Sequence, residues 1–211
     1  PTVAVQGLGC RLVIAKSGTV SIPYLELTGD GANAGSLCVR EGCTVDFTGE
    51  INCRWRLRPF IEKSAKVNFH GNVGHSNYLT MQTAEGSEIH LHCPIYGSNV
   101  GYGNGKIYLH STESSSSYAN IFLGDAPYIC TAENTMPTLI NYFRYDSSKG
   151  IFDLNGYNQL VKRFVMNDVT GVATYGALTS PESMPAKIRF EGCDTVVFKN
   201  RFTGSAGLEW D

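Results

Sequence analysis

Apolar and polar residues alternate in three segments of the chain that align with one another without a gap. The segments are residues 40–51, 62–73 and 84–95, so each begins 22 residues after the one before. Their apolar positions coincide, as at Val45, Val67 and Ile89, and the residues between these positions are mostly polar. Alternation with a period of two is the pattern of a strand with one buried face. The segments therefore predict equivalent strands in successive copies of one repeat.

Self-similarity at a fixed period near 20 residues indicates a solenoid. A leucine-rich repeat shares the period, but its Leu-x-x-Leu-x-Leu-x-x-Asn frame is absent. At about 3.3 Å per residue, a turn of this length makes three short strands, each parallel to its equivalent in the next turn. We predict an all-β fold, a right-handed parallel β-helix with rungs of about 22 residues. Three parallel sheets would stack Val45, Val67 and Ile89 inward.

The repeat becomes weaker along the chain. A fourth copy covers residues 106–110 at a step of 18, and later echoes occupy 150–156 and 194–199. We predict a single β-helix domain over residues 1–211, with regular rungs at about 10–110 and less regular rungs at 111–211. Proline and turn-forming residues predict longer excursions in 124–150 and around 176–186, and residues 155–163 predict one helical turn.

Composition and charge narrow the functional classes. Charged residues make up 17% of the chain and glycine occurs 23 times, which suits a strand-rich protein with many turns. The formal net charge of −2 gives no electrostatic support to a nucleic-acid partner. No run of 18 apolar residues predicts a transmembrane helix in this window. Because both ends resemble cuts within a strand pattern, we expect a fragment of a longer chain.

Seven cysteines are dispersed along the chain without the spacing of a zinc site. They are Cys10, Cys38, Cys43, Cys53, Cys93, Cys130 and Cys193. Small buried apolar side chains in a strand core explain them best. A disulfide such as Cys38–Cys43 or Cys43–Cys53 is the alternative for an exported chain.

Several glycine-rich and aliphatic motifs resemble one known family. Residues 25–31, 35–37 and 44–51 resemble the L-x-G-x-G, G-x-L and T-x-x-G-x-I rhythm of autotransporter-associated β-strand repeats. Residues 103–109, 121–124, Leu139 and 150–159 follow the family pattern in order, so the resemblance covers about 20–165. It implies a passenger-type β-helix that is secreted or lies on a bacterial surface. Because the repeat is structural, it implies no catalytic residue.

Two outward columns of polar residues follow from the predicted register. One contains Asp46, Asn68, His90 and Tyr108, and the next contains Thr48, His70, His92 and His110. Equivalent residues of successive rungs lie about 4.8 Å apart. His70, His92 and His110 are therefore a candidate site for Zn²⁺ or Ni²⁺, since imidazole is a common ligand of both. A solvated histidine ladder without a metal, with no carboxylate beside it, is the interpretation we favour.

A compact basic and aromatic cluster is the candidate ligand-binding site. It consists of Arg54, Trp55, Arg56 and Arg58. Arginine beside tryptophan can stack on a sugar or bind an anionic glycan. The alternative is a corner between rungs, with Trp55 packed inward and the arginines in solvent.

The sequence is compatible with two classes of function. The acidic residues do not fall into adjacent pairs in the predicted register, although a glycoside hydrolase needs two carboxylates about 5–10 Å apart. We therefore predict a non-catalytic structural or adhesive module without a cofactor, which binds glycans or a host or matrix surface. The alternative is a carbohydrate-active enzyme, a polysaccharide lyase or hydrolase, or its ancillary domain.

The last strand pattern predicts self-association. Leu208 and Trp210 alternate with polar neighbours, so one face of the terminal strand is apolar. An exposed strand edge offers unpaired N–H and C=O groups to another chain. We therefore expect end-to-end association of this fragment at high concentration.

Overall fold

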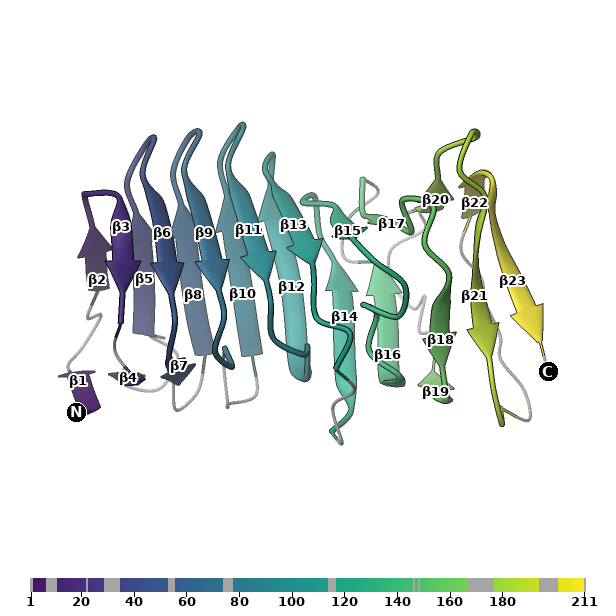
Figure 1. The fold of residues 1–211 in the computed structure, drawn as a ribbon, viewed down its shortest axis with the longest axis horizontal. Coiled ribbons are helices and arrows are strands. Elements are labelled where there is room, and N and C mark those ends of the chain that lie inside the picture. Colours follow the sequence, from purple (N-terminus) through teal and green to yellow (C-terminus); the bar gives the residue numbers. More distant parts are fainter. Residues whose placement is uncertain are drawn as a thin grey trace.

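A computed structural model describes the chain at residues 2–6, 11–21, 23–28, 35–52, 56–73, 78–113, 117–145, 147, 149–166, 177–193 and 201–210. Within these ranges the regular structure consists of strands only (Figure 1). No described helix is long and apolar enough to cross a membrane. The strands are β1 (Thr2–Gln6), β2 (Arg11–Ile14), β3 (Gly18–Val20), β4 (Tyr24–Thr28), β5 (Gly35–Val39), β6 (Thr44–Phe47), β7 (Glu50–Asn52), β8 (Arg56–Ile61), β9 (Lys66–Phe69), β10 (Tyr78–Thr83), β11 (Glu88–Leu91), β12 (Gly97–Gly103), β13 (Lys106–Leu109), β14 (Ala119–Leu123), β15 (Tyr128–Cys130), β16 (Leu139–Tyr145), β17 (Ile151–Asp153), β18 (Gln159–Val161), β19 (Arg163–Met166), β20 (Ala177–Ser180), β21 (Ala186–Phe190), β22 (Arg201–Gly204) and β23 (Ala206–Trp210).

Two long parallel sheets run the length of the molecule. The eight-stranded sheet has the order β2-β5-β8-β10-β12-β14-β16-β19, and the nine-stranded sheet has the order β3-β6-β9-β11-β13-β15-β17-β20-β22. Two three-stranded sheets, β1-β4-β7 and β18-β21-β23, lie at opposite ends of the solenoid (Figure 1). The predicted parallel sheets are therefore present, but in the described residues the third one consists of these two short sheets and does not run the length of the molecule.

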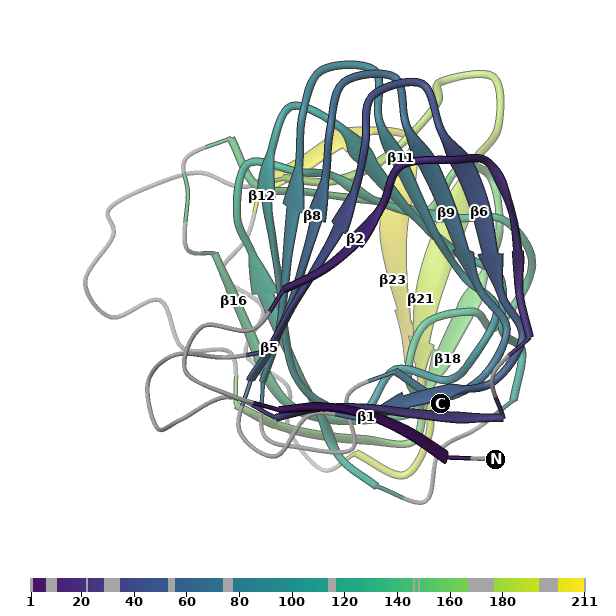
Figure 2. The same ribbon diagram turned by 90° about the vertical axis from the view of Figure 1, so that its left-hand side faces the viewer.

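The chain winds as a right-handed solenoid. In Figure 2, which faces the N-terminal end, it passes clockwise from β2 over the top to β3 and then to β4 as it recedes. A right-handed crossover between parallel strands is the hand that twisted strands favour. The right-handed parallel β-helix predicted from the repeat is confirmed.

The predicted register holds in the middle of the solenoid. Val45 pairs with Val67, which pairs with Ile89, a step of 22 residues each time, and Ile89 pairs with Ile107 after 18. All four side chains are completely buried. Elsewhere the step changes, reaching 27 between β3 and β6 and 29 between β18 and β21. The exact 22-residue step connects β5–β8–β10 and β6–β9–β11, and it recurs between β1 and β4, between β12 and β14, and over most of the pairing of β14 with β16.

A continuous apolar column fills the interior of the solenoid. Aromatic rings stack on one another along it, with centroid distances of 5.5 Å between Phe47 and Phe69 and 6.2 Å between Tyr128 and Phe152. A single rung could not bury these side chains alone, so each rung depends on its neighbours.

Corners with left-handed backbone connect the two long sheets. Gly42, Ser64 and Gly86 have φ values of 67°, 55° and 69°, and they occupy equivalent positions 22 residues apart. In each corner the next residue donates its N–H to the carbonyl three residues back, as Ala65 does to Glu62 at 3.1 Å. A positive φ at the third position of such a turn favours glycine. This corner fixes the angle at which the chain leaves one sheet for the other.

Two expectations about local structure are corrected. Residues 155–163 form a turn followed by β18 and the start of β19, because Asn155 and Gly156 adopt positive φ and end any helical path. The expected excursions in 124–150 and 176–186 are partly regular, since they contain β15, β16 and β20. The favoured interpretation of the cysteines is confirmed at Cys38, Cys43, Cys93 and Cys130, which are free and buried, so neither alternative disulfide is formed. Residues 194–199, Cys10 and Cys53 lie outside the described residues.

We expect Val67→Asp to lower the free energy of unfolding by about 4 kcal/mol, because it buries a carboxylate with no partner in the core column. Chemical denaturation followed by circular dichroism measures the change. Thr44→Asp is the matched control, since Thr44 is exposed on the outer face and pairs in register with Lys66. It should change the value by less than about 0.5 kcal/mol. Equal stability of the two variants would contradict the register.

Candidate functional site

Four histidines form a ladder on the outer face of the nine-stranded sheet. His90 belongs to β11, and His70, His92 and His110 directly follow β9, β11 and β13. The ring centroids of His70 and His92 are 4.5 Å apart, and those of His92 and His110 are 4.3 Å apart, with interplanar angles of 14° and 12°. The predicted column is therefore present. We call these four residues the histidine ladder.

The stacked rings do not form the predicted metal site. Among the described residues, no group of three or more His, Cys, Asp or Glu side chains is arranged to hold a metal ion. His70, His92 and His110 are thus stacked neighbours and are not arranged as metal ligands.

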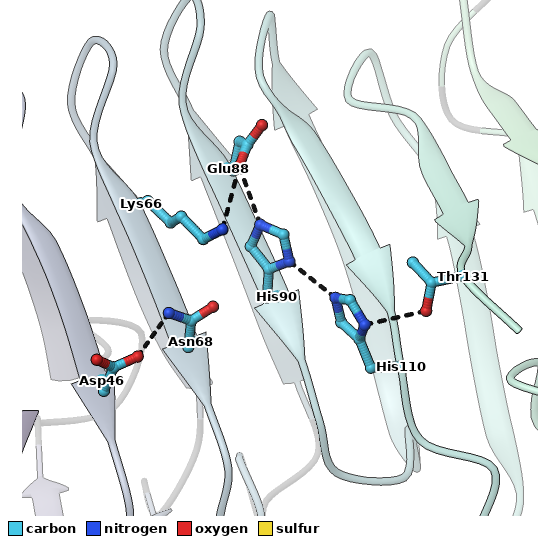
Figure 3. A network of polar contacts seen from close by, with 7 residues as sticks. All are labelled: Asp46, Lys66, Asn68, Glu88, His90, His110 and Thr131. Atoms are coloured by element: carbon cyan, nitrogen blue, oxygen red, sulfur yellow. Dashed lines mark hydrogen bonds and ion pairs between the residues drawn. The ribbon is translucent and has the colours of Figure 1, made fainter.

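His90 lies at the centre of a hydrogen-bonded chain across three strands (Figure 3). Its Nε2 is 3.0 Å from Oε2 of Glu88, and its Nδ1 is 2.8 Å from Nε2 of His110. Nδ1 of His110 is in turn 3.0 Å from Oγ1 of Thr131, which also donates to the carbonyl of Leu109 at 2.7 Å. His90 also stacks on Tyr108 at 4.6 Å. These neighbours leave His90 only 9% exposed on an outer face.

Carboxylates lie beside the ladder, contrary to the sequence interpretation. Glu88 contacts His90, and Oδ1 of Asp46 lies 3.9 Å from Nε2 of His70. Asp46 also accepts a hydrogen bond of 2.6 Å from Asn68 (Figure 3). The contact between Glu88 and His90 could have been predicted from sequence, since the two residues are two positions apart on one strand and so share a face.

Burial and neighbouring positive charges lower the pKa of three histidines of the ladder, His90, His92 and His110. Partial burial, followed by the charges of His92 and His90, lowers the pKa of His110 to about 4. Burial also lowers the pKa of His90 and of His92. The hydrogen bond from His90 lowers the pKa of the Glu88 carboxyl. His90, His92 and His110 are therefore largely uncharged at neutral pH, with Glu88 ionised beside His90.

A second surface lies on the outer face of the eight-stranded sheet. Its members are Arg56, Arg58 and Phe60 of β8, Tyr78 of β10 and Tyr102 of β12. We call it the arginine–aromatic face. Tyr78 is 44% exposed, and the guanidinium carbon of Arg56 lies 5.1 Å from the centre of its ring. Phe60 and Tyr102 are also exposed, and both pair in register with Gln82.

The structure tests only part of the predicted basic cluster. Arg56 and Arg58 share the outer face of β8, separated by the inward Leu57. Arg54 and Trp55 lie outside the described residues. The aromatic partner of Arg56 comes from the next rung, at Tyr78, which is 22 residues away. The predicted repeat could have identified this pair, because Arg56 and Tyr78 occupy the same column.

Comparison with known proteins adds no family assignment. No protein-family model matches the chain, and no curated protein or solved structure matches it either. The parallel β-helix therefore rests on the structure itself, and the resemblance to autotransporter-associated repeats stays a prediction.

We expect acid to destabilise the fold through the histidine ladder. A histidine with a lower pKa in the folded chain binds protons less well there than when unfolded. The contribution of His90, His92 and His110 to stability is therefore fully present above the ordinary pKa of 6.5, and it falls as the pH drops towards about 4. Urea denaturation at pH 7.5 and pH 4.5 measures this loss.

His110→Asn is the variant that isolates the effect. It removes the ring whose pKa burial lowers to about 4, so the stability of the variant should depend less on pH over the same interval. If wild type and variant lose equal stability between pH 7.5 and pH 4.5, other groups cause the acid sensitivity.

Proposed function

We propose that this chain is a non-catalytic structural and adhesive module of a secreted or bacterial surface protein, of the autotransporter-like kind. On this proposal it binds acidic glycans through the arginine–aromatic face. The carrying observation is the stack of the half-buried Arg56 on the exposed Tyr78, with Phe60 and Tyr102 exposed on the same sheet.

The chemistry of this face suits a charged sugar chain. An aromatic ring offers a flat apolar surface to a sugar ring, and guanidinium binds a carboxylate through two parallel hydrogen bonds. The stack on Tyr78 orients Arg56, which reduces the freedom it loses on binding. Successive rungs repeat at about 4.8 Å, so the sheet presents contacts in a row to an extended polymer.

The register of the sheets supports the non-catalytic assignment over the enzymatic alternative. A retaining glycosidase places two carboxyl groups about 5 Å apart. In the described strand pairs, the carboxylates face other residue types, as Glu88 faces Lys66 and Asp46 faces Asn68. Asp153 faces Thr179 in the same way. No described strand pair sets two carboxylates opposite each other.

Binding of the purified chain to alginate, a polyuronate, tests the proposal, with neutral dextran as the reference polymer. We expect alginate to bind, and Arg56→Ala or Tyr78→Ala to weaken it about 5- to 30-fold, about 1–2 kcal/mol. Calorimetry in low salt gives the affinities.

Arg201→Ala is the matched control, because it removes the same charge from β22 of the other long sheet. It should leave alginate binding unchanged. Binding that is absent, or that all three variants weaken equally, would contradict this surface. Release of new chain ends from alginate during the assay would favour the lyase or hydrolase alternative.

A further inference from the structure

The chain of contacts through His90 can be analysed by counting protons. Four contacts connect five groups in a row: Glu88 with His90, His90 with His110, His110 with Thr131, and Thr131 with the carbonyl of Leu109. Each contact needs one hydrogen between its two heavy atoms, because a carboxylate and a carbonyl oxygen only accept. The complete geometry therefore requires four hydrogens.

When both imidazoles are neutral, the groups supply only three of these four hydrogens. Each neutral imidazole carries one hydrogen, and the hydroxyl of Thr131 carries one. With Glu88 ionised, His90 donates from Nε2 to Glu88 and His110 donates from Nε2 to His90. The hydroxyl of Thr131 then donates to Nδ1 of His110, and its contact with the carbonyl of Leu109 is left without a hydrogen.

One additional proton completes the chain. It binds at Nδ1 of His110, which then donates to Oγ1 of Thr131, and the hydroxyl rotates to donate to the carbonyl of Leu109. The hydrogen between the rings can move from Nε2 of His110 to Nδ1 of His90, and this brings the positive charge next to Glu88. All four contacts, including the 2.7 Å contact with Leu109, are then satisfied.

A second proton is incompatible with this geometry. Both facing ring nitrogens would carry a hydrogen across a distance of 2.8 Å, and two imidazolium charges would lie 5.0 Å apart at their centroids. Like charges at this distance repel strongly when they are partly buried. The contact between the rings must then open.

We propose that His90 and His110 form a joint binding site for a single proton, balanced by Glu88, and that this proton fastens β11, β13 and β15 together on the outer face. The site goes beyond the proposed glycan binding, which lies on the other long sheet. Uptake of a second proton releases the fastening, and the loss of stability expected between pH 7.5 and pH 4.5 belongs to this second step.

The charges around the site come from each neighbouring strand. From β9, Lys66 lies 3.7 Å from Glu88, and from β13, Lys106 pairs with Glu88 in register. Asp46 of β6 sits beside His70, so it balances the far end of the ladder. Tyr108 and His92 stack on the two rings. From β15, the facing residues are the uncharged Ile129 and Thr131.

Glu88 is the only carboxylate bonded to these rings in the described structure, and it makes the first proton favourable. Lys66, Lys106 and His92 oppose further charge. Because the two rings interact directly, their titration has two apparent pKa values that belong to the pair. In the first step one proton binds and the chain of contacts stays intact. In the second step another proton binds and the contact between the two rings opens.

Imidazole ¹⁵N NMR of the histidine-labelled chain, recorded from pH 8 downwards, tests the proposal. Protonated and unprotonated ring nitrogens have well separated shifts. We expect Nε2 of His90 to stay protonated throughout, and Nδ1 of His110 to gain a proton in the first step. A scalar coupling between Nδ1 of His90 and Nε2 of His110 should persist through that step and vanish in the second.

Glu88→Gln removes the balancing charge and keeps the size of the side chain. It should lower the apparent pKa of the first step by about one unit. Glu85→Gln is the matched control, because Glu85 is exposed in the turn of the same rung, and it should leave that step unchanged.

Three results would overturn the proposal. They are independent titration of His90 and His110, absence of the coupling between the rings, or an Nδ1 of His110 that gains its proton only as the chain unfolds. The wild-type titration decides these points even if Glu88→Gln does not fold.

Discussion

Parallel backbone pairing determines where every outward side chain of this solenoid lies. Each strand hydrogen bonds to its equivalent one rung away, so residues at one position of the repeat form a column with a spacing of about 4.8 Å. A slip of one residue would turn Val67 outward and Asn68 into the core. The buried column thus holds the outer columns in register, and both candidate surfaces depend on it.

The fold could be predicted from sequence because the same constraint is visible there. Three segments share a step of 22 residues and a period of two, and these two numbers define the inward column of Val45, Val67 and Ile89. The irregular steps could not be predicted, since inserted residues leave the sheets at corners, where neither period applies. The turn at Asn155 and Gly156 is an example, because its positive φ values separate β17 from β18 where the sequence predicts one helical turn.

The candidate sites were only partly predictable for a different reason. Column membership predicted that His70, His92 and His110 would be neighbours, and they are. The hydrogen bond from His90 to His110 runs diagonally between two columns, so it depends on side-chain rotamers, which no periodicity encodes. Stacking of flat rings also decided the outcome for a metal, because it sets the ring planes parallel. The position of a residue in the repeat therefore predicts which residues are neighbours. The rotamer of each side chain then decides which hydrogen bonds these neighbours form.

The equivalent corners at Gly42, Ser64 and Gly86 make the 22-residue unit interchangeable. A segment that begins and ends at such a corner enters and leaves with the same backbone direction, and it presents the same inward residues to the rungs on either side. Duplication or loss of one such unit in the gene would lengthen or shorten the solenoid by one rung without a new junction. Solenoid length is therefore a property that unequal recombination can change in single steps while the packing of the remaining rungs is preserved.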